Sequence, residues 1–109
     1  MLCIGFSACV QKTYRKTVVF SLDVHDAEEI KSVAIRGAEK PLSWRKDVEM
    51  RSETKDSLYR ITVSFLTGYK FTKVKFVVNG EFELKDKDNR RVNFDEGDTT
   101  FYSAVFNSK

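Results

Sequence analysis

Apolar and polar residues alternate along most of this chain, with the period of two that is typical of β-strands with one buried face. The longest alternating segments are residues 18–24, 59–65 and 71–78, which are rich in β-branched and aromatic side chains. Shorter segments with the same pattern are 33–37, 48–50, 82–84, 92–94 and 100–106. Helical periodicity is nearly absent, with one turn at most at 27–31. The pattern predicts an all-β protein.

Turn signals separate the predicted strands. Asn79-Gly80 is the strongest, because both residues tolerate the positive φ that a type I′ turn requires. About seven or eight short strands, with a turn roughly every eight to twelve residues, are typical of an Ig-like antiparallel β-sandwich. The chain has 109 residues, which suffice for one hydrophobic core but not for two. We therefore expect one Ig-like antiparallel β-sandwich over residues 16–109.

Residues 1–15 differ from this pattern and are expected to be a lipoprotein signal remnant and tether. Both cysteines, Cys3 and Cys9, lie here, so they cannot staple the sandwich. The segment Phe6-Ser-Ala-Cys9 resembles a bacterial lipobox, with Phe6 where leucine is usual. The resemblance implies lipidation of Cys9, a place in the bacterial cell envelope or outside the cell, and membrane contact only through the lipid. The alternative is an N-terminal strand with two buried cysteines, in a cytoplasmic protein.

The charges argue against a nucleic-acid partner. Lys and Arg number 19 and Asp and Glu 16, for a net charge of +3. The two signs interleave, and the basic clusters are only pairs: Arg15-Lys16, Arg45-Lys46 and Arg90-Arg91. Such a pattern is typical of a solvated surface and not of a stripe that follows a phosphate backbone.

The sequence offers little material for catalysis. Its one histidine, His25, lies in a polar turn, so a nucleophile–histidine pair or a metal site is hard to assemble. Glycoside cleavage needs one carboxylic acid in an apolar pocket. Glu81 and Glu83 share one face of a predicted strand, opposite Phe82 and Leu84, and are expected to be solvated. We interpret the chain as a non-enzyme without a cofactor.

Trp44 is the first candidate for a binding site. It is the only tryptophan and lies in a loop that contains Pro41. Indole faces stack on the C–H groups of sugar rings, while ammonium and amide groups such as those of Lys75 and Asn89 bind the hydroxyls. The alternative is that Trp44 covers the edge of the core, that Lys75 faces solvent and that Asn89 is an ordinary turn residue.

Four segments resemble, in order and spacing, the starch-binding domains of carbohydrate-binding module families 20 and 48. The latter include the glycogen-binding domain of AMP-activated kinase β subunits. The segments are 33–44, 59–63, 74–80 and 87–90, and the resemblance extends from Thr17 to Phe106. It implies the same β-sandwich, with Trp44 as a stacking platform, Lys75 as the lysine that binds glucose hydroxyls, and Asn89 as the family asparagine.

The second stacking platform, a tryptophan in most binders, has two candidate positions. Alignment on Asn79-Gly80 puts it at Phe82, and alignment on Asn89-Arg90 puts it at Leu84, with Lys85 where some members have glutamate. Phe82 could stack with a smaller face, whereas Leu84 could only pack.

The expected function is thus a non-catalytic module that binds starch- or glycogen-type α-glucans, as polysaccharide or oligosaccharide, beside a fused or neighbouring catalytic domain. The alternative is a sandwich that has lost sugar binding and packs against a neighbouring domain or subunit. In that case Trp44, Phe82 and Tyr102 would form an exposed patch that faces another protein.

Overall fold

The computed structural model describes residues 13–25, 27, 29–55, 57–85 and 87–108, and these contain nine β-strands and no helix. The strands are β1 (Tyr14–Asp23), β2 (Val33–Gly37), β3 (Val48–Glu49), β4 (Arg51–Thr54), β5 (Leu58–Thr67), β6 (Phe71–Val78), β7 (Glu81–Phe82), β8 (Arg90–Asn93) and β9 (Thr99–Val105). The predicted all-β class is confirmed. The predicted lipidation of Cys9 lies outside the described residues.

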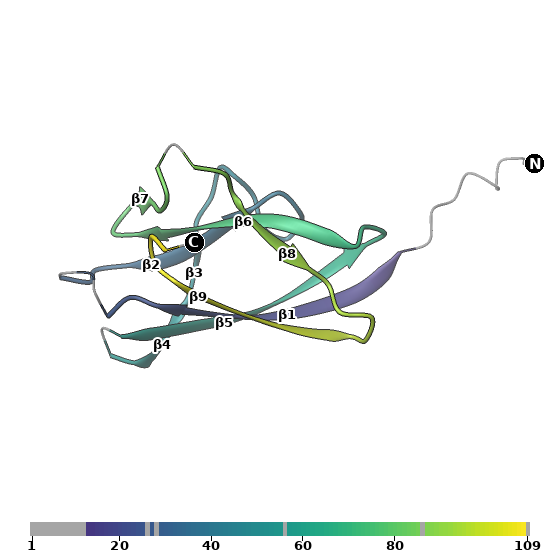
Figure 1. The fold of residues 1–109 in the computed structure, drawn as a ribbon, viewed down its shortest axis with the longest axis horizontal. Coiled ribbons are helices and arrows are strands. Elements are labelled where there is room, and N and C mark those ends of the chain that lie inside the picture. Colours follow the sequence, from purple (N-terminus) through teal and green to yellow (C-terminus); the bar gives the residue numbers. More distant parts are fainter. Residues whose placement is uncertain (1–12, 26, 28, 56, 86, 109) are drawn as a thin grey trace, which may run out of the picture.

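Two sheets form the sandwich, and they are visible in Figure 1 as an upper and a lower layer. One sheet has the order β4-β5-β1-β9. The other has the order β3-β2-β6-β7, and β8 also pairs with β6. All pairs are antiparallel except β1 with β9, which run parallel from Thr17 opposite Thr99 to Asp23 opposite Val105. The sandwich is therefore mixed and not wholly antiparallel as expected.

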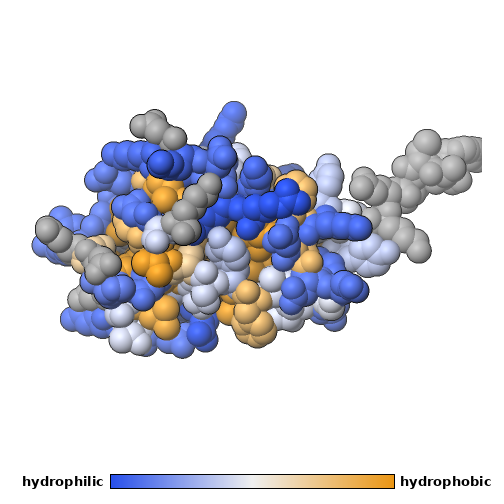
Figure 2. Space-filling view, in the orientation of Figure 1, coloured by the Kyte–Doolittle hydropathy of each residue, from blue (hydrophilic) through white to orange (hydrophobic). Residues whose placement is uncertain are grey.

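The core lies between the sheets, where the predicted alternation places the apolar side chains. Phe20 of β1, Phe65 of β5 and Phe76 of β6 are fully buried. The ring of Phe20 meets those of Phe76 and Tyr102 edge to face, at centroid distances of 6.2 and 6.0 Å. Each buried phenylalanine contributes about 1.5–3 kcal/mol of apolar burial. On the outer surface, Figure 2 shows apolar residues as separate patches among hydrophilic ones.

The segment 48–54 crosses from one sheet to the other. The sequence predicts one brief strand here, whereas the structure has two, with β3 paired to β2 and β4 paired to β5. Met50 lies between them, is 6% exposed, and donates its N–H to the carbonyl of Val33 at 2.8 Å. The buried Met50 side chain thus anchors the crossing in the core.

The hairpin after β6 begins as predicted and then departs from the prediction. Asn79 and Gly80 have φ values of 53° and 80°, which confirms the expected turn with two positive φ angles. The alternation predicts that the returning strand includes Leu84, but β7 ends at Phe82, and Leu84 has a φ of 50° that turns the chain away. β8 then pairs with the first half of β6, and β7 with its end.

The gap between β7 and β8 is filled by Glu83. The N–H of Glu83 donates to the carbonyl of Phe76 at 3.0 Å, and the N–H of Phe76 donates to the Glu83 carboxylate at 3.0 Å. A side chain therefore supplies the hydrogen bond that a longer β7 would have made. Glu83 is fully buried, so the expectation that it is solvated is wrong.

Candidate functional site

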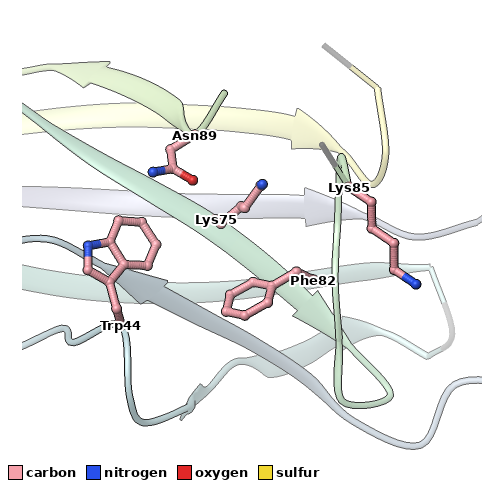
Figure 3. Close-up of a pocket in the computed structure, with 5 residues that line it drawn as sticks. All are labelled: Trp44, Lys75, Phe82, Lys85 and Asn89. Carbon is pink, nitrogen blue, oxygen red and sulfur yellow. The ribbon is translucent and has the colours of Figure 1, made fainter. Parts of the chain in front are cut away.

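Five of the residues that the structure describes line a depression of about 590 Å³ that is open to solvent, namely Trp44, Lys75, Phe82, Lys85 and Asn89. They come from the loop after β2, from β6, from β7 and from the β7–β8 connection (Figure 3). The volume lies in the range of roughly 300–1,000 Å³ that small-ligand sites occupy. Five of the six residues predicted to contact a ligand are thus neighbours in space.

The loop that carries Trp44 is fixed to the core at Gly37 and Leu42. Leu42 is 3% exposed, and a Cβ on Gly37 would lie only 2.9 Å from its Cδ1 and 3.0 Å from the carbonyl oxygen of Lys73. Only glycine permits this close approach, because any larger residue would push the loop outward. The N–H of Gly37 also donates to the carbonyl of Ser43 at 3.3 Å. The loop therefore leaves β2 in a defined direction.

Trp44 lies at the surface and not in the core. Its exposed fraction is 37%, and the indole faces the depression, across from Lys75 and Asn89 (Figure 3). The indole is thus only partly exposed, and part of its surface packs against the rest of the domain. The exposed face is available to a flat apolar ligand.

Arg36 of β2 connects the two aromatic residues of the site. Its Nη1 donates to the backbone carbonyl of Trp44 at 2.8 Å, and its Nε donates to Asp47 at 2.7 Å. Its guanidinium carbon also lies 5.2 Å from the centre of the Phe82 ring, within cation–π range. The sequence analysis missed Arg36, although the alternation of residues 33–37 places it on the outward side of β2, directly opposite Lys75.

Lys75 and Asn89 both line the depression and lie near each other in it (Figure 3). The Lys75 ammonium donates to the carbonyl of Lys87 at 3.1 Å, which leaves donor capacity on the same group. Both side chains are half-buried, so they are positioned more firmly than freely solvated ones. Their ammonium and amide groups are the kinds that bind hydroxyls.

Phe82 and Lys85 form the opposite end of the depression. Phe82 is 38% exposed, comparable to Trp44. Lys85 extends beyond Phe82 and away from the centre of the site (Figure 3), where its ammonium lies 3.2 Å from the Glu81 carboxylate. This exposed ion pair contributes at most about 1 kcal/mol of stability.

Leu84 is the predicted residue that does not join the site. It is 8% exposed, is absent from the lining of the depression, and donates its N–H to the side chain of Asn107 at 2.8 Å. Of the two candidate positions for a second platform, Phe82 is therefore the one at the surface.

A buried ion pair holds the β7–β8 connection together. Arg90 Nε lies 2.7 Å from one Glu83 oxygen and Arg90 Nη2 lies 2.8 Å from the other. Nη2 also donates to the carbonyls of Val105 and Ser108, at 2.9 and 2.6 Å. Burial by itself would lower the pKa of Arg90, but the hydrogen bonds and charge of Glu83, with help from Tyr102, raise it. The Arg90 guanidinium therefore remains charged.

The position of this pair in the sequence explains its importance. Glu83 follows Phe82 and Arg90 follows Asn89, so the pair fixes the two ends of a segment that supplies Lys85 and Asn89 to the depression, and Phe82 directly precedes this segment. The sequence carries no sign of this role, because neither residue lies in an apolar run.

The described residues contain neither a metal-ligand cluster nor a membrane-spanning helix. In the part of the chain that the structure describes, no group of three or more His, Cys, Asp or Glu side chains could hold a metal ion. The same part contains no helix long and apolar enough to cross a membrane. His25 bonds with Asp23 at 2.5 Å, far in sequence from the depression. In comparisons with known proteins, no family model and no curated sequence matches this chain.

Proposed function

We propose that the domain is a non-catalytic module that binds starch- or glycogen-type α-glucans at the depression between Trp44 and Phe82. One observation carries the proposal: an exposed indole lies in the same depression as an ammonium group, an amide and a second exposed aromatic ring. The site residues are also those to which the resemblance to carbohydrate-binding module families 20 and 48 assigns ligand contacts.

The chemistry of a glucan suits this arrangement. The C–H face of one glucose unit would stack on Trp44, and the C–H face of a glucose unit further along the chain would stack on Phe82. Lys75 would donate to hydroxyls, while the amide of Asn89 both donates and accepts. A phenyl ring offers less contact area than an indole, so we expect affinity lower by about 1–3 kcal/mol than with two tryptophans.

A direct test is available because Trp44 is the only tryptophan. Maltoheptaose or β-cyclodextrin is titrated into the protein while indole emission is followed, with cellohexaose as the β-linked control. We expect a saturable change at millimolar or lower concentrations of α-glucan only. Trp44→Ala should abolish the heat of binding in calorimetry while the unfolding transition stays cooperative. Unchanged emission at millimolar α-glucan would contradict the proposal.

For the alternative interaction domain, the sequence predicts a protein-facing patch formed by Trp44, Phe82 and Tyr102. Tyr102 is half-buried and packs against Phe20 in the core, so it does not join the other two. The exposed aromatic residue of β9 is Phe101, at 77%, and β9 belongs to the other sheet. The predicted patch of three residues is therefore wrong, whereas Trp44 and Phe82 line one depression, as the glucan proposal requires.

The proposed location follows separately from Cys9. In a bacterial host, a lipidated chain would fractionate with membranes, and Cys9→Ala would release it. Membrane association that survives Cys9→Ala would contradict lipid anchoring. That outcome would not bear on the glucan proposal. The presence of a fused or neighbouring catalytic domain would not bear on it either.

A further inference from the structure

A second depression adjoins the candidate site. Its volume is about 480 Å³, and it shares Phe82 and Lys85 with the first. Its other lining residues come from the loop after β1, from the β6–β7 hairpin and from the C-terminal segment: Ala27, Val78, Asn79, Glu81, Phe106 and Asn107. Phe82 and Lys85 therefore form a wall that the two depressions have in common.

The two depressions follow one another in a consistent direction. Trp44 and Phe82 lie on opposite sides of Lys75, and Lys85 extends past Phe82 (Figure 3). Because Phe82 and Lys85 also line the second depression, a linear ligand that stacks on Trp44 and then on Phe82 would reach the edge of that depression. A glucan that is longer than the first depression needs a further binding surface next to Phe82.

The second depression offers both kinds of contact that a sugar needs. Phe106 and Ala27 are half-buried and supply apolar surface. Glu81 has an exposed carboxylate whose only hydrogen bond within the described residues comes from Lys85. The Asn107 oxygen accepts the N–H of Leu84, while its Nδ2 has no hydrogen-bond partner among the described residues. The Glu81 carboxylate, an acceptor, and the Asn107 amide nitrogen, a donor, thus belong to residues that line the same depression.

The local charge favours a neutral ligand. The carboxylate of Glu81 and the ammonium of Lys85 lie 3.2 Å apart and offset each other, so the lining residues that the structure describes carry no excess of either sign. An anionic chain would gain little from such a pair, whereas hydroxyl groups can donate to the carboxylate and accept from the ammonium.

We propose that the second depression is an extension subsite that takes further glucose units of the same α-glucan, beyond Phe82. This inference rests on the proposed function of the first depression. It adds that the protein selects chain length, because a short oligosaccharide fills only the site between Trp44 and Phe82, whereas a longer one also contacts Glu81 and Asn107.

The experiment compares maltotriose with maltoheptaose, by calorimetry and by Trp44 emission. In the native protein we expect maltoheptaose to bind more tightly by about tenfold, the effect of one or two added hydrogen bonds. Glu81→Ala should reduce that ratio by about two- to fivefold and leave maltotriose affinity within about twofold. Glu49→Ala is the matched control, because Glu49 is an exposed strand glutamate that lines neither depression.

The outcomes separate this inference from the proposed function. If both oligosaccharides bind with equal affinity, or if Glu81→Ala leaves the ratio unchanged, the extension subsite is wrong and the glucan site stands. If neither oligosaccharide binds, both proposals are overturned. If the ratio of maltoheptaose affinity to maltotriose affinity falls in Glu81→Ala but not in Glu49→Ala, the extension subsite is supported.

Discussion

The guanidinium of Arg90 donates to both carboxylate oxygens of Glu83 inside the domain, at 2.7 and 2.8 Å. Glu83 is fully buried and Arg90 is 6% exposed. The sequence neighbours of this pair, Phe82 and Asn89, both line the candidate site. A buried charge pair is weak evidence for stability by itself, since desolvation offsets much of the attraction. Here its clearest consequence is the fixed position of two surface side chains.

Removal of one partner should be costly. Glu83→Ala leaves the Arg90 charge buried without its counter-ion, and also leaves the N–H of Phe76 without an acceptor. We expect the free energy of unfolding to fall by about 3–5 kcal/mol. Urea denaturation followed by circular dichroism measures the change.

The double variant Glu83→Leu with Arg90→Met provides the comparison. Both charges are gone, so the loss should be smaller than for Glu83→Ala by at least about 1 kcal/mol. A double variant no more stable than the single one would show that packing, and not the unpaired charge, sets the cost.

Gly37 should tolerate no side chain. In Gly37→Ala the new Cβ would lie 2.9 Å from Leu42 and 3.0 Å from a backbone oxygen, so the loop that carries Trp44 must shift. We expect a loss of about 1–3 kcal/mol in stability, measured by thermal unfolding, together with weaker glucan binding. Gly97→Ala is the matched control, because nothing lies within 4 Å of the place that its new methyl group would take. Equal losses in both variants would contradict this explanation.

The alternation of side chains predicted most of the fold because each long strand has one face on the core. β6 matches the predicted segment 71–78, and the turn at Asn79-Gly80 matches as well. The prediction failed after Phe82 because the apolar Leu84 suggested a continued alternation. Its positive φ and the insertion of the Glu83 side chain into the sheet depend on Arg90 and on the C-terminal segment. Such long-range contacts leave no local pattern.

Part of the candidate site could also be predicted from the sequence. Trp44, Lys75 and Asn89 could be singled out by residue type and by their order in the resembling segments. Arg36 could not, because its role depends on contacts with two segments, the carbonyl of Trp44 and Asp47 in the loop after β2 and the ring of Phe82 in β7. The parallel pair of β1 with β9 was missed because period two does not reveal strand direction.

Arg36 should act on binding more than on stability. Arg36→Met keeps the aliphatic stem but loses the hydrogen bonds to Trp44 and Asp47. The exposed ion pair is worth at most about 1 kcal/mol in folding, whereas a mobile Trp44 loop should weaken α-glucan binding by about three- to tenfold. Calorimetry and urea denaturation separate the two effects.

Arg91→Met is the matched control for Arg36. Arg91 is on the same sheet and its guanidinium lies 3.7 Å from the centre of the Phe71 ring, but it does not line the depression. Its removal should leave glucan affinity unchanged. If both variants weaken binding equally, the effect is one of general surface charge and not of the position of Trp44.

Asp23 should make the folding stability of the domain slightly sensitive to low pH. The backbone N–H of His25, and then its side chain, hold the pKa of the Asp23 carboxyl below its ordinary value of 3.8. Because the folded pKa is the lower one, the contribution to stability is present above about pH 3.8 and is lost as the pH falls through the folded pKa. Asp23→Asn should therefore lose less stability than the native protein between about pH 5 and pH 2. An Asp23 carboxyl signal that titrates at or above its ordinary value in NMR would contradict this.

A larger aromatic ring at position 82 should increase the affinity for α-glucan. The ring is 38% exposed, lines the depression and has the Arg36 guanidinium 5.2 Å from its centre, so a larger ring can stay at the same position. Phe82→Trp should strengthen maltoheptaose binding by about three- to tenfold, because an indole offers more stacking area. Phe82→Ala should weaken it by a similar factor. Calorimetry is the measurement, since a second tryptophan complicates the emission. Tighter binding with Phe82→Leu than with Phe82→Trp would show that Phe82 acts by packing and not by stacking on the sugar.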